Sequence, residues 1–256
     1  MAIGGYLGSI FGGPLGAILG AVLGHKIEGA AFGKSGGYAS MSSGNRSMIF
    51  CASAAAMLAK LAKADGHVLA TEITAVEQAF QRLGFSPSAR RYAIEVFRRA
   101  KDDTHTIYEY AYEFASAVPS VEVRELFYEL LWELAKADGV VSRNELAILR
   151  RIPRALGIRD EWFEVFAAAC RDSASSSRQS RQPPPRDPLA DAYAELAVSP
   201  SATDDEVKKA YREKAKKYHP DALKAQGLPD EMLGKATERM ARINAAWDAI
   251  KEARGL

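Results

Sequence analysis

The stretch from Thr203 to Asp221, TDDEVKKAYREKAKKYHPD, constrains this chain most, because it joins a basic helix directly to a His-Pro-Asp corner. Thr203 and Glu206 have the spacing of a capping box, which predicts a helix start. Acidic residues follow in the first turn and basic residues after them, the order that the helix dipole favours. The helix is expected to end near Tyr218, because Pro220 disfavours the helical conformation of the residue before it. The corner is therefore predicted to be exposed on a bend.

Two further helices flank this stretch. Upstream, Asp187 and Pro188 predict the start of a short helix. Downstream, apolar residues recur every three or four positions, which marks one buried helical face: Leu233, Ala236, Met240, Ile243, Trp247 and Ile250. Three helices in this order, with the corner after the second, resemble the J domain of DnaJ-type co-chaperones. The resemblance covers residues 188–256.

That resemblance implies a partner and a docking surface. J domains bind DnaK-type chaperones and stimulate their ATP hydrolysis, using the basic face of the second helix and the corner. The matching positions in this sequence are Lys208, Tyr211, Arg212, His219, Pro220 and Asp221. Glu213 departs from the pattern, since many J domains are basic there. Lys214 also departs, and its stem is expected to lie on the core while its ammonium reaches water.

Other functions of the same stretch are less favoured. Clustered lysines can bind phosphate, but the J-like segment carries as many acidic as basic side chains, so nucleic acid is not expected as a partner. No Ser or Cys nucleophile lies near His219 and Asp221 in sequence, and Pro220 separates the pair. The sequence therefore predicts neither catalytic residues nor a cofactor, and the protein is not expected to be an enzyme.

The N-terminal segment has no charged side chain from Ala2 to Gly24. As a helix, roughly 22 residues extend about 33 Å, which matches the hydrocarbon core of a bilayer. Glycine recurs every fourth position and predicts a groove for close helix packing in lipid, and hence a homodimer, at Gly8, Gly12, Gly16 and Gly20. Pro14 opposes a continuous span because it removes one backbone hydrogen bond. Residues 1–27 are predicted to form a single transmembrane anchor.

Charge and composition then set the orientation and the linkers. Basic residues follow the span, which predicts that the soluble domains lie in the cytoplasm. Residues 28–46, rich in Gly, Ser and Ala, are predicted to be a flexible linker, and residues 173–187 a disordered one. The two soluble domains are then 47–172 and 188–256.

The middle domain is predicted to be all-α, with seven helices and no strand. The expected starts or spans are Met48–Ala64, Thr71–Leu83, a start at Ser86-Pro87, a start at Thr104, a start at Ser120, a capping box at Ser142 and Glu145, and a last helix from Asp160 to Cys170. Cys51 and Cys170 lie on apolar helical stretches and are expected to be reduced core thiols.

An internal repeat is the most informative feature of this domain. The segment 61–68, LAKADGHV, recurs as LAKADGVV at 134–141, and a glutamate follows each copy. The Ala-Asp-Gly signature resembles the TerB family of tellurite-resistance-associated helical domains, over residues 48–172. Four carboxylates of the repeat are candidate ligands for a divalent cation, namely Asp65, Glu72, Asp138 and Glu145. The favoured alternative is local, with each Asp-Gly forming a turn and each Glu capping a helix, so no metal is predicted.

The order of parts resembles that of membrane-anchored, DnaJ-like co-chaperones of bacteria. We therefore expect a co-chaperone tethered at the membrane, whose J domain binds a DnaK-type chaperone and stimulates its ATP hydrolysis. Two alternatives remain: a TerB-type scaffold that responds to metal or tellurite stress, and a membrane assembly protein built on the glycine groove. Nothing in the sequence indicates the client proteins or the partner of the middle domain.

Overall fold

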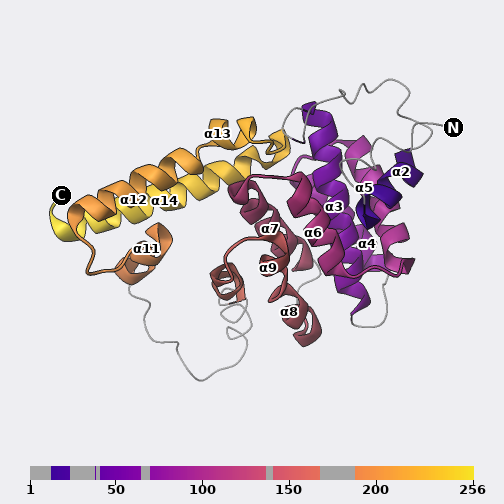
Figure 1. Cartoon of the computed structure of the whole chain (residues 1–256), viewed down its shortest axis with the longest axis horizontal. Helices are drawn as coiled ribbons and strands as arrows, with labels where there is room; N and C mark the ends of the chain where they lie inside the picture. The colour runs from indigo at the N-terminus through magenta and orange to yellow at the C-terminus, as the bar shows by residue number, and fades with distance from the viewer. Residues whose placement is uncertain (1–12, 24–37, 39–40, 65–69, 137–140, 168–187) are drawn as a thin grey trace.

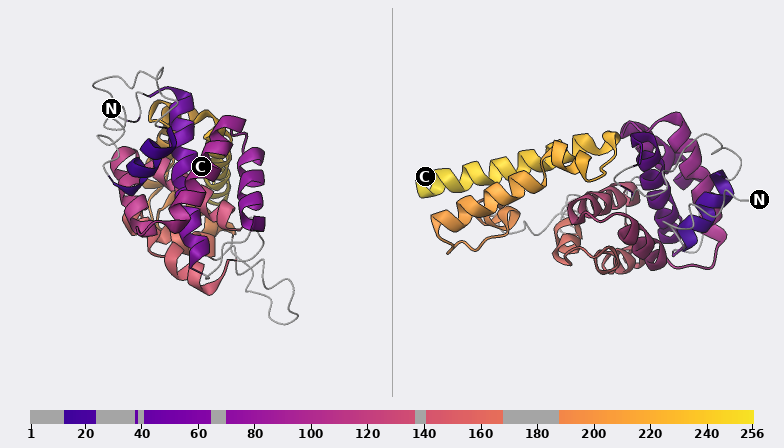
Figure 2. Two further views of the ribbon diagram at one scale, coloured as in Figure 1. Left: turned by 90° about the vertical axis from the view of Figure 1, so that its right-hand side faces the viewer. Right: turned by 45° about the horizontal axis from the view of Figure 1, so that its top comes forward.

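The computed structural model describes residues 13–23, 38, 41–64, 70–136, 141–167 and 188–256. Within these ranges the backbone forms helices and connecting turns and no strand, which confirms the predicted all-α class. The N-terminal helices form a bundle, and two long antiparallel helices of the C-terminal part lie side by side and extend away from it (Figures 1 and 2).

Helix α3 (Ser43–Lys63) is the centre of the bundle. It packs against α5 (Pro87–Asp102), α6 (Ile107–Ala117) and α7 (Val121–Ala135), and its alanine-rich middle is buried on all sides. A helix that is apolar around its whole circumference belongs in a core. The hydroxyl of Ser42 caps the first turn of α3, so this helix begins inside the range predicted to be linker and five residues before Met48.

Three aromatic rings join α3 to its neighbours. Phe50 meets the rings of Phe114 and Phe127 edge-on, with centroids 5.7 and 5.0 Å away, and the latter two rings stack at 3.9 Å. All three are fully buried. The apolar stripes read from the sequence therefore pack as a core. Cys51 lies in the same core as a free thiol, as predicted, whereas Cys170 lies outside the described residues.

Side-chain caps explain most helix starts of the middle domain. The side chains of Ser86 and Ser120 cap α5 and α7 as predicted. The prediction for α6 was wrong by two residues, because Thr106 rather than Thr104 forms a capping box with Glu109. α4 (Ala70–Arg82) precedes α5 and packs on it.

The helix predicted to start at Ser142 is interrupted. It forms α8 (Arg143–Leu149) and then α9 (Ile152–Leu156), because Pro153 has no amide hydrogen to continue the α8 ladder. Residues 161–167 form a further helical segment. The described part of the middle domain thus has eight helical segments, α3 to α9 and this last one, instead of the predicted seven.

Helix α2 (Pro14–Leu23) packs against α5 and α6 of the bundle, with Leu15 and Ile18 buried. Pro14 is its first residue, so the proline does not interrupt the middle of the helix. Among the residues that the structure describes, no helix combines the length and the apolar character needed to cross a bilayer.

The C-terminal part contains the three helices predicted for a J domain and one short helix that was not predicted. These are α11 (Pro188–Leu196), α12 (Asp204–Lys217), α13 (Pro220–Ala225) and α14 (Leu233–Arg254), with a 3₁₀ turn, η2 (Asp230–Met232), before the last. α11 and α12 both pack on α14. Of the predicted apolar stripe of α14, Ala236, Ile243 and Ile250 are buried.

Candidate functional site

The His-Pro-Asp corner lies between α12 and α13. His219 is the N-cap residue of α13, and its Nδ1 accepts a hydrogen bond from the amide of Asp221 at 3.2 Å. Pro220 opens the helix, a position that suits a residue with no amide hydrogen. The side chains of His219 and Asp221 are 57% and 93% exposed. The corner is therefore exposed, and it is the start of a short helix as well as a bend.

Helix α12 approaches the corner with the capping predicted from the sequence. The amide of Glu206 donates to the hydroxyl of Thr203 at 3.3 Å, and the amide of Thr203 donates to the Glu206 carboxylate at 2.7 Å. The amide and the hydroxyl of Thr203 both donate hydrogen bonds to the Glu206 carboxylate, and these two bonds lower the pKa of Glu206. The helix ends at Lys217, with Tyr218 as its C-cap residue.

The predicted docking residues of α12 differ in their surroundings. Arg212 is exposed and Lys208 is half-buried. Tyr211 is held inside the domain, because its ring stacks on Trp247 at 4.9 Å and its hydroxyl donates to Asn244 at 3.2 Å. The structure thus leaves the basic side chains available on the helix surface and fixes the tyrosine between α12 and α14.

Lys214 behaves differently from the sequence expectation. Its ammonium donates to the backbone carbonyl of Glu195, near the end of α11, and the residue is half-buried. Burial, followed by the charge of Arg239, lowers the pKa of Lys214 to about 8. The stem does lie on the domain, but the charged end is used to satisfy a carbonyl at a helix terminus.

The candidate metal ligands are only partly within the described chain. Asp65 and Asp138 lie outside it, and Glu72 lies in α4 with its side chain not described. Glu145 forms a capping box with Ser142, whose amide donates to the glutamate at 2.8 Å. This is the local role that the sequence favoured. Among the described residues, no group of three or more His, Cys, Asp or Glu side chains is arranged to hold a metal ion.

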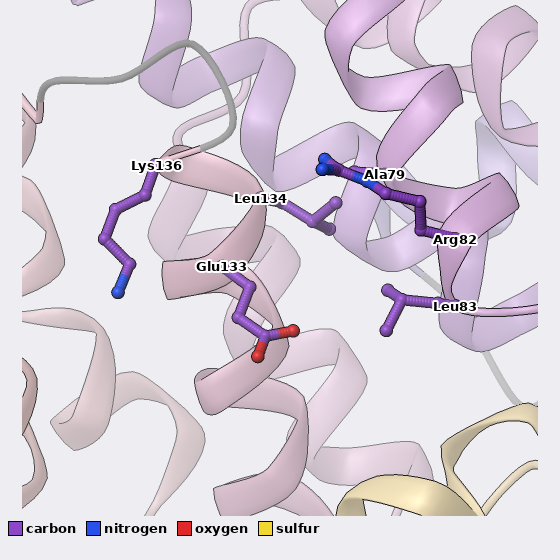
Figure 3. Close-up of a pocket in the computed structure, with 6 residues that line it drawn as sticks. All are labelled: Ala79, Arg82, Leu83, Glu133, Leu134 and Lys136. Carbon is purple, nitrogen blue, oxygen red and sulfur yellow. The ribbon is translucent and has the colours of Figure 1, made fainter.

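One cavity that the sequence did not indicate lies between α4 and α7. It measures about 360 Å³ and is lined by Ala79, Arg82, Leu83, Glu133, Leu134 and Lys136 (Figure 3). The wall residue Glu133 also pairs with Lys235 of α14. The cavity therefore borders the contact between the middle domain and the J-like domain.

The contact between the middle domain and the J-like domain is the second feature that the sequence did not predict. Both carboxylate oxygens of Glu129 on α7 lie 3.3 Å from Arg242 on α14. On the other side, Ser47 of α3 donates to Glu231 at 2.5 Å. The four-residue spacing of glutamates on α7 was a signal in the sequence, but nothing in it indicated which surface they meet.

Comparison with known proteins assigns both domains. The model of the family "Tellurite resistance protein TerB" matches residues 52–168, and that of the DnaJ domain matches residues 191–254. The chain is 36% identical to the co-chaperone protein DjlA of Photobacterium profundum over 78% of its own length and 76% of that relative. This chain belongs to the DjlA co-chaperone family.

Other DjlA proteins agree with this assignment. The chain is 33% identical to the one from Vibrio cholerae, over 81% of this chain and 78% of the relative. It is also 33% identical to the one from Coxiella burnetii, over 77% and 74%. No solved structure matches the chain. The chain is thus a DjlA-like J-domain co-chaperone with a TerB-like middle domain.

Proposed function

We propose that this DjlA-like chain binds a DnaK-type chaperone and stimulates its ATP hydrolysis through the corner and the basic face of α12. The observation that carries the proposal is the exposure of the corner, where the Asp221 side chain is 93% accessible at the end of a basic helix. The assigned DnaJ domain supports the same partner.

The chemistry of the surface favours docking over catalysis. Exposed cations on α12, Arg212 among them, attract an acidic partner surface and raise the rate of encounter at low salt. The corner then offers one imidazole and one carboxylate held in a fixed relation by the α13 cap. The hydrolytic residues belong to the partner, and the chain acts by binding it.

Replacement of His219 by Gln tests the proposal directly. The fold should survive because the side chain is exposed, whereas stimulation of the ATPase of a DnaK-type chaperone should be lost. Single-turnover ATP hydrolysis by that chaperone with increasing amounts of the chain measures the effect. Glu77→Gln is the control, since Glu77 is exposed on α4 and far along the chain from the J domain. Full stimulation by the His219→Gln variant would refute the mechanism.

We further propose that residues 1–27 attach the chain to the bacterial inner membrane by one span, with the soluble domains in the cytoplasm. The support is the uncharged stretch from Ala2 to Gly24 and the basic residues that follow it. The glycine groove would pair two such segments as a homodimer. Gly8 and Gly12 lie outside the described residues, whereas Gly16 is buried in α2 and Gly20 belongs to the same helix.

Leucine at Gly8 and Gly12 tests the groove and leaves the α2 contact unchanged. The double variant keeps the segment apolar but removes the close approach of two backbones. Cross-linking in isolated membranes should give dimers for the natural chain and monomers for the variant. Recovery of the natural chain in the soluble fraction would contradict the anchor, and equal dimer yields would assign the dimer to other residues.

A further inference from the structure

A row of glutamates on α7 faces the J domain. Glu125, Glu129 and Glu133 are four residues apart, so they lie on one side of the helix. Glu129 meets Arg242 and Glu133 meets Lys235, both on α14. Glu125 has a different partner, because its carboxylate accepts a hydrogen bond from the hydroxyl of Tyr218.

Glu125 is the most enclosed member of this row. It is only 4% exposed, and its second oxygen accepts from the indole of Trp162 at 2.8 Å. Arg239 covers both aromatic partners, with its guanidinium 4.4 Å from the Trp162 ring and 5.3 Å from the Tyr218 ring. A buried carboxylate needs such donors, because burying an unpaired one costs free energy on the order of several kcal/mol. The two bonds therefore define where Tyr218 must lie.

Tyr218 connects this cluster to the corner. It is the C-cap residue of α12, and the next residue, His219, is the N-cap of α13. Burial, followed by the charge of Glu125, raises the pKa of Tyr218, so its phenol remains a donor. Rotation or displacement of Tyr218 would move the backbone that leads into His219, whose own side chain is exposed.

We propose that Glu125 of the TerB-like domain is a positioning residue for the His-Pro-Asp corner, acting across the domain boundary through Tyr218. The proposal rests on the proposed function, because it assigns the corner to the docking of a DnaK-type chaperone. It gives the TerB-like domain a direct part in J-domain activity. The corner is held by the middle domain on its buried side and presented to the partner on its exposed side.

The test compares Tyr218→Phe, Glu125→Gln and the double variant in the full chain. Phenylalanine keeps the buried ring and removes the donor, while glutamine keeps the shape of Glu125 and loses one acceptor oxygen. Tyr193→Phe is the matched control, since it removes a hydroxyl that is bonded to Arg254 at the opposite end of the J domain. Glu161→Gln, exposed beside Trp162, controls for the lost charge.

Stimulation of a DnaK-type ATPase is measured against the concentration of the chain. Each single variant should raise the half-maximal concentration by about five- to tenfold, the size expected for one charge-assisted hydrogen bond, and should keep the maximal rate. The double variant should be no worse than the poorer single one, because both remove the same bond. Hydrogen exchange at residues 219–225 should be faster in all three, and the controls should match the natural chain.

The outcomes separate this inference from the function on which it rests. If Asp221→Asn retains stimulation, the proposed function is wrong. If Asp221→Asn abolishes stimulation but Tyr218→Phe and Glu125→Gln match the natural chain, only the positioning role is refuted. Effects of the two single changes that multiply in the double variant would also refute it, because they would show two independent perturbations.

Discussion

The ammonium of Lys214 joins two helices of the J domain, although the sequence suggested that it would extend to solvent. A lysine on the inner side of α12 would ordinarily extend its ammonium to solvent. Here the ammonium bonds the carbonyl of Glu195, and burial together with Arg239 lowers its pKa to about 8. The hydrogen bond ties α12 to the end of α11, at the cost of partial desolvation of a charge.

The pH dependence of stability should report this lysine. Its pKa is about 8 in the folded chain and near the ordinary 10.5 when unfolded. Between these values the unfolded chain binds the extra proton, so the free energy of unfolding rises with pH. Relative to Lys214→Met, the natural chain should gain about 1 kcal/mol between pH values of about 7.5 and 10, after allowance for solvent screening. Urea unfolding at several pH values measures this gain, and parallel curves would contradict it.

At the scale of elements, the first turn of α2 is capped by a single carboxylate from another helix. Glu113 of α6 accepts hydrogen bonds from the amides of Gly13, Leu15 and Gly16, at 2.9, 2.6 and 3.0 Å. These amides lie at the start of α2, where no intrahelical acceptor is available and the helix dipole favours a negative charge. The carboxylate thus takes the place of a local cap, from a position about 100 residues away in sequence.

Replacement of Glu113 by Ala should release α2 from the bundle. The loss of the acceptors should lower the free energy of unfolding by about 1–2 kcal/mol and speed hydrogen exchange in residues 13–23. It should also expose Leu15 and Ile18, which are buried in the natural chain. Tyr112→Ala on the exposed side of α6 is the control. Unchanged exchange in α2 would show that apolar packing alone holds the helix.

For the whole molecule, charged contacts between α7 and α14 are part of what joins the two domains. Glu129 is 7% exposed, whereas the side chain of Arg242 is 42% exposed. The glutamate therefore depends on its partner more than the arginine does, because it is the one withdrawn from water. Arg242 lies near the middle of α14, and the two long helices of the J domain extend away from the bundle (Figure 2).

Reversing the charge at Glu129 should separate the two domains, and exchanging the charges of Glu129 and Arg242 should restore the contact between them. Glu129→Arg places two cations together and should increase the radius of gyration measured by small-angle X-ray scattering. The double variant Glu129→Arg with Arg242→Glu should recover the compact value, since attraction returns with the signs exchanged. Arg150→Glu is the control, because its pairing with Glu164 at 3.9 Å lies on an exposed surface. A double variant as extended as the single one would show that other contacts decide the arrangement.

The features that sequence alone determined depend on near neighbours along the chain. The capping boxes at Thr203 and Ser142, the end of α12 before Pro220 and the apolar faces of the helices all follow from residues a few positions apart. The motifs of both domains, including the exposed corner, could be located for the same reason. Where a second capping residue competed, as with Thr104 and Thr106, the start was misplaced by two positions.

Tertiary structure decided the contacts between residues far apart in sequence. Tyr218 and Glu125 are 93 residues apart, and Glu113 lies 97 to 100 residues from the amides that it caps. No periodicity reveals such a partner, because the choice depends on how whole helices pack once their apolar faces are buried. A carboxylate on α7 or α6 looks like a solvated side chain in the sequence. Packing removes the carboxylate from water, and it then accepts a hydrogen bond from the nearest donor. For Glu125 that donor is the hydroxyl of Tyr218, the residue before the corner.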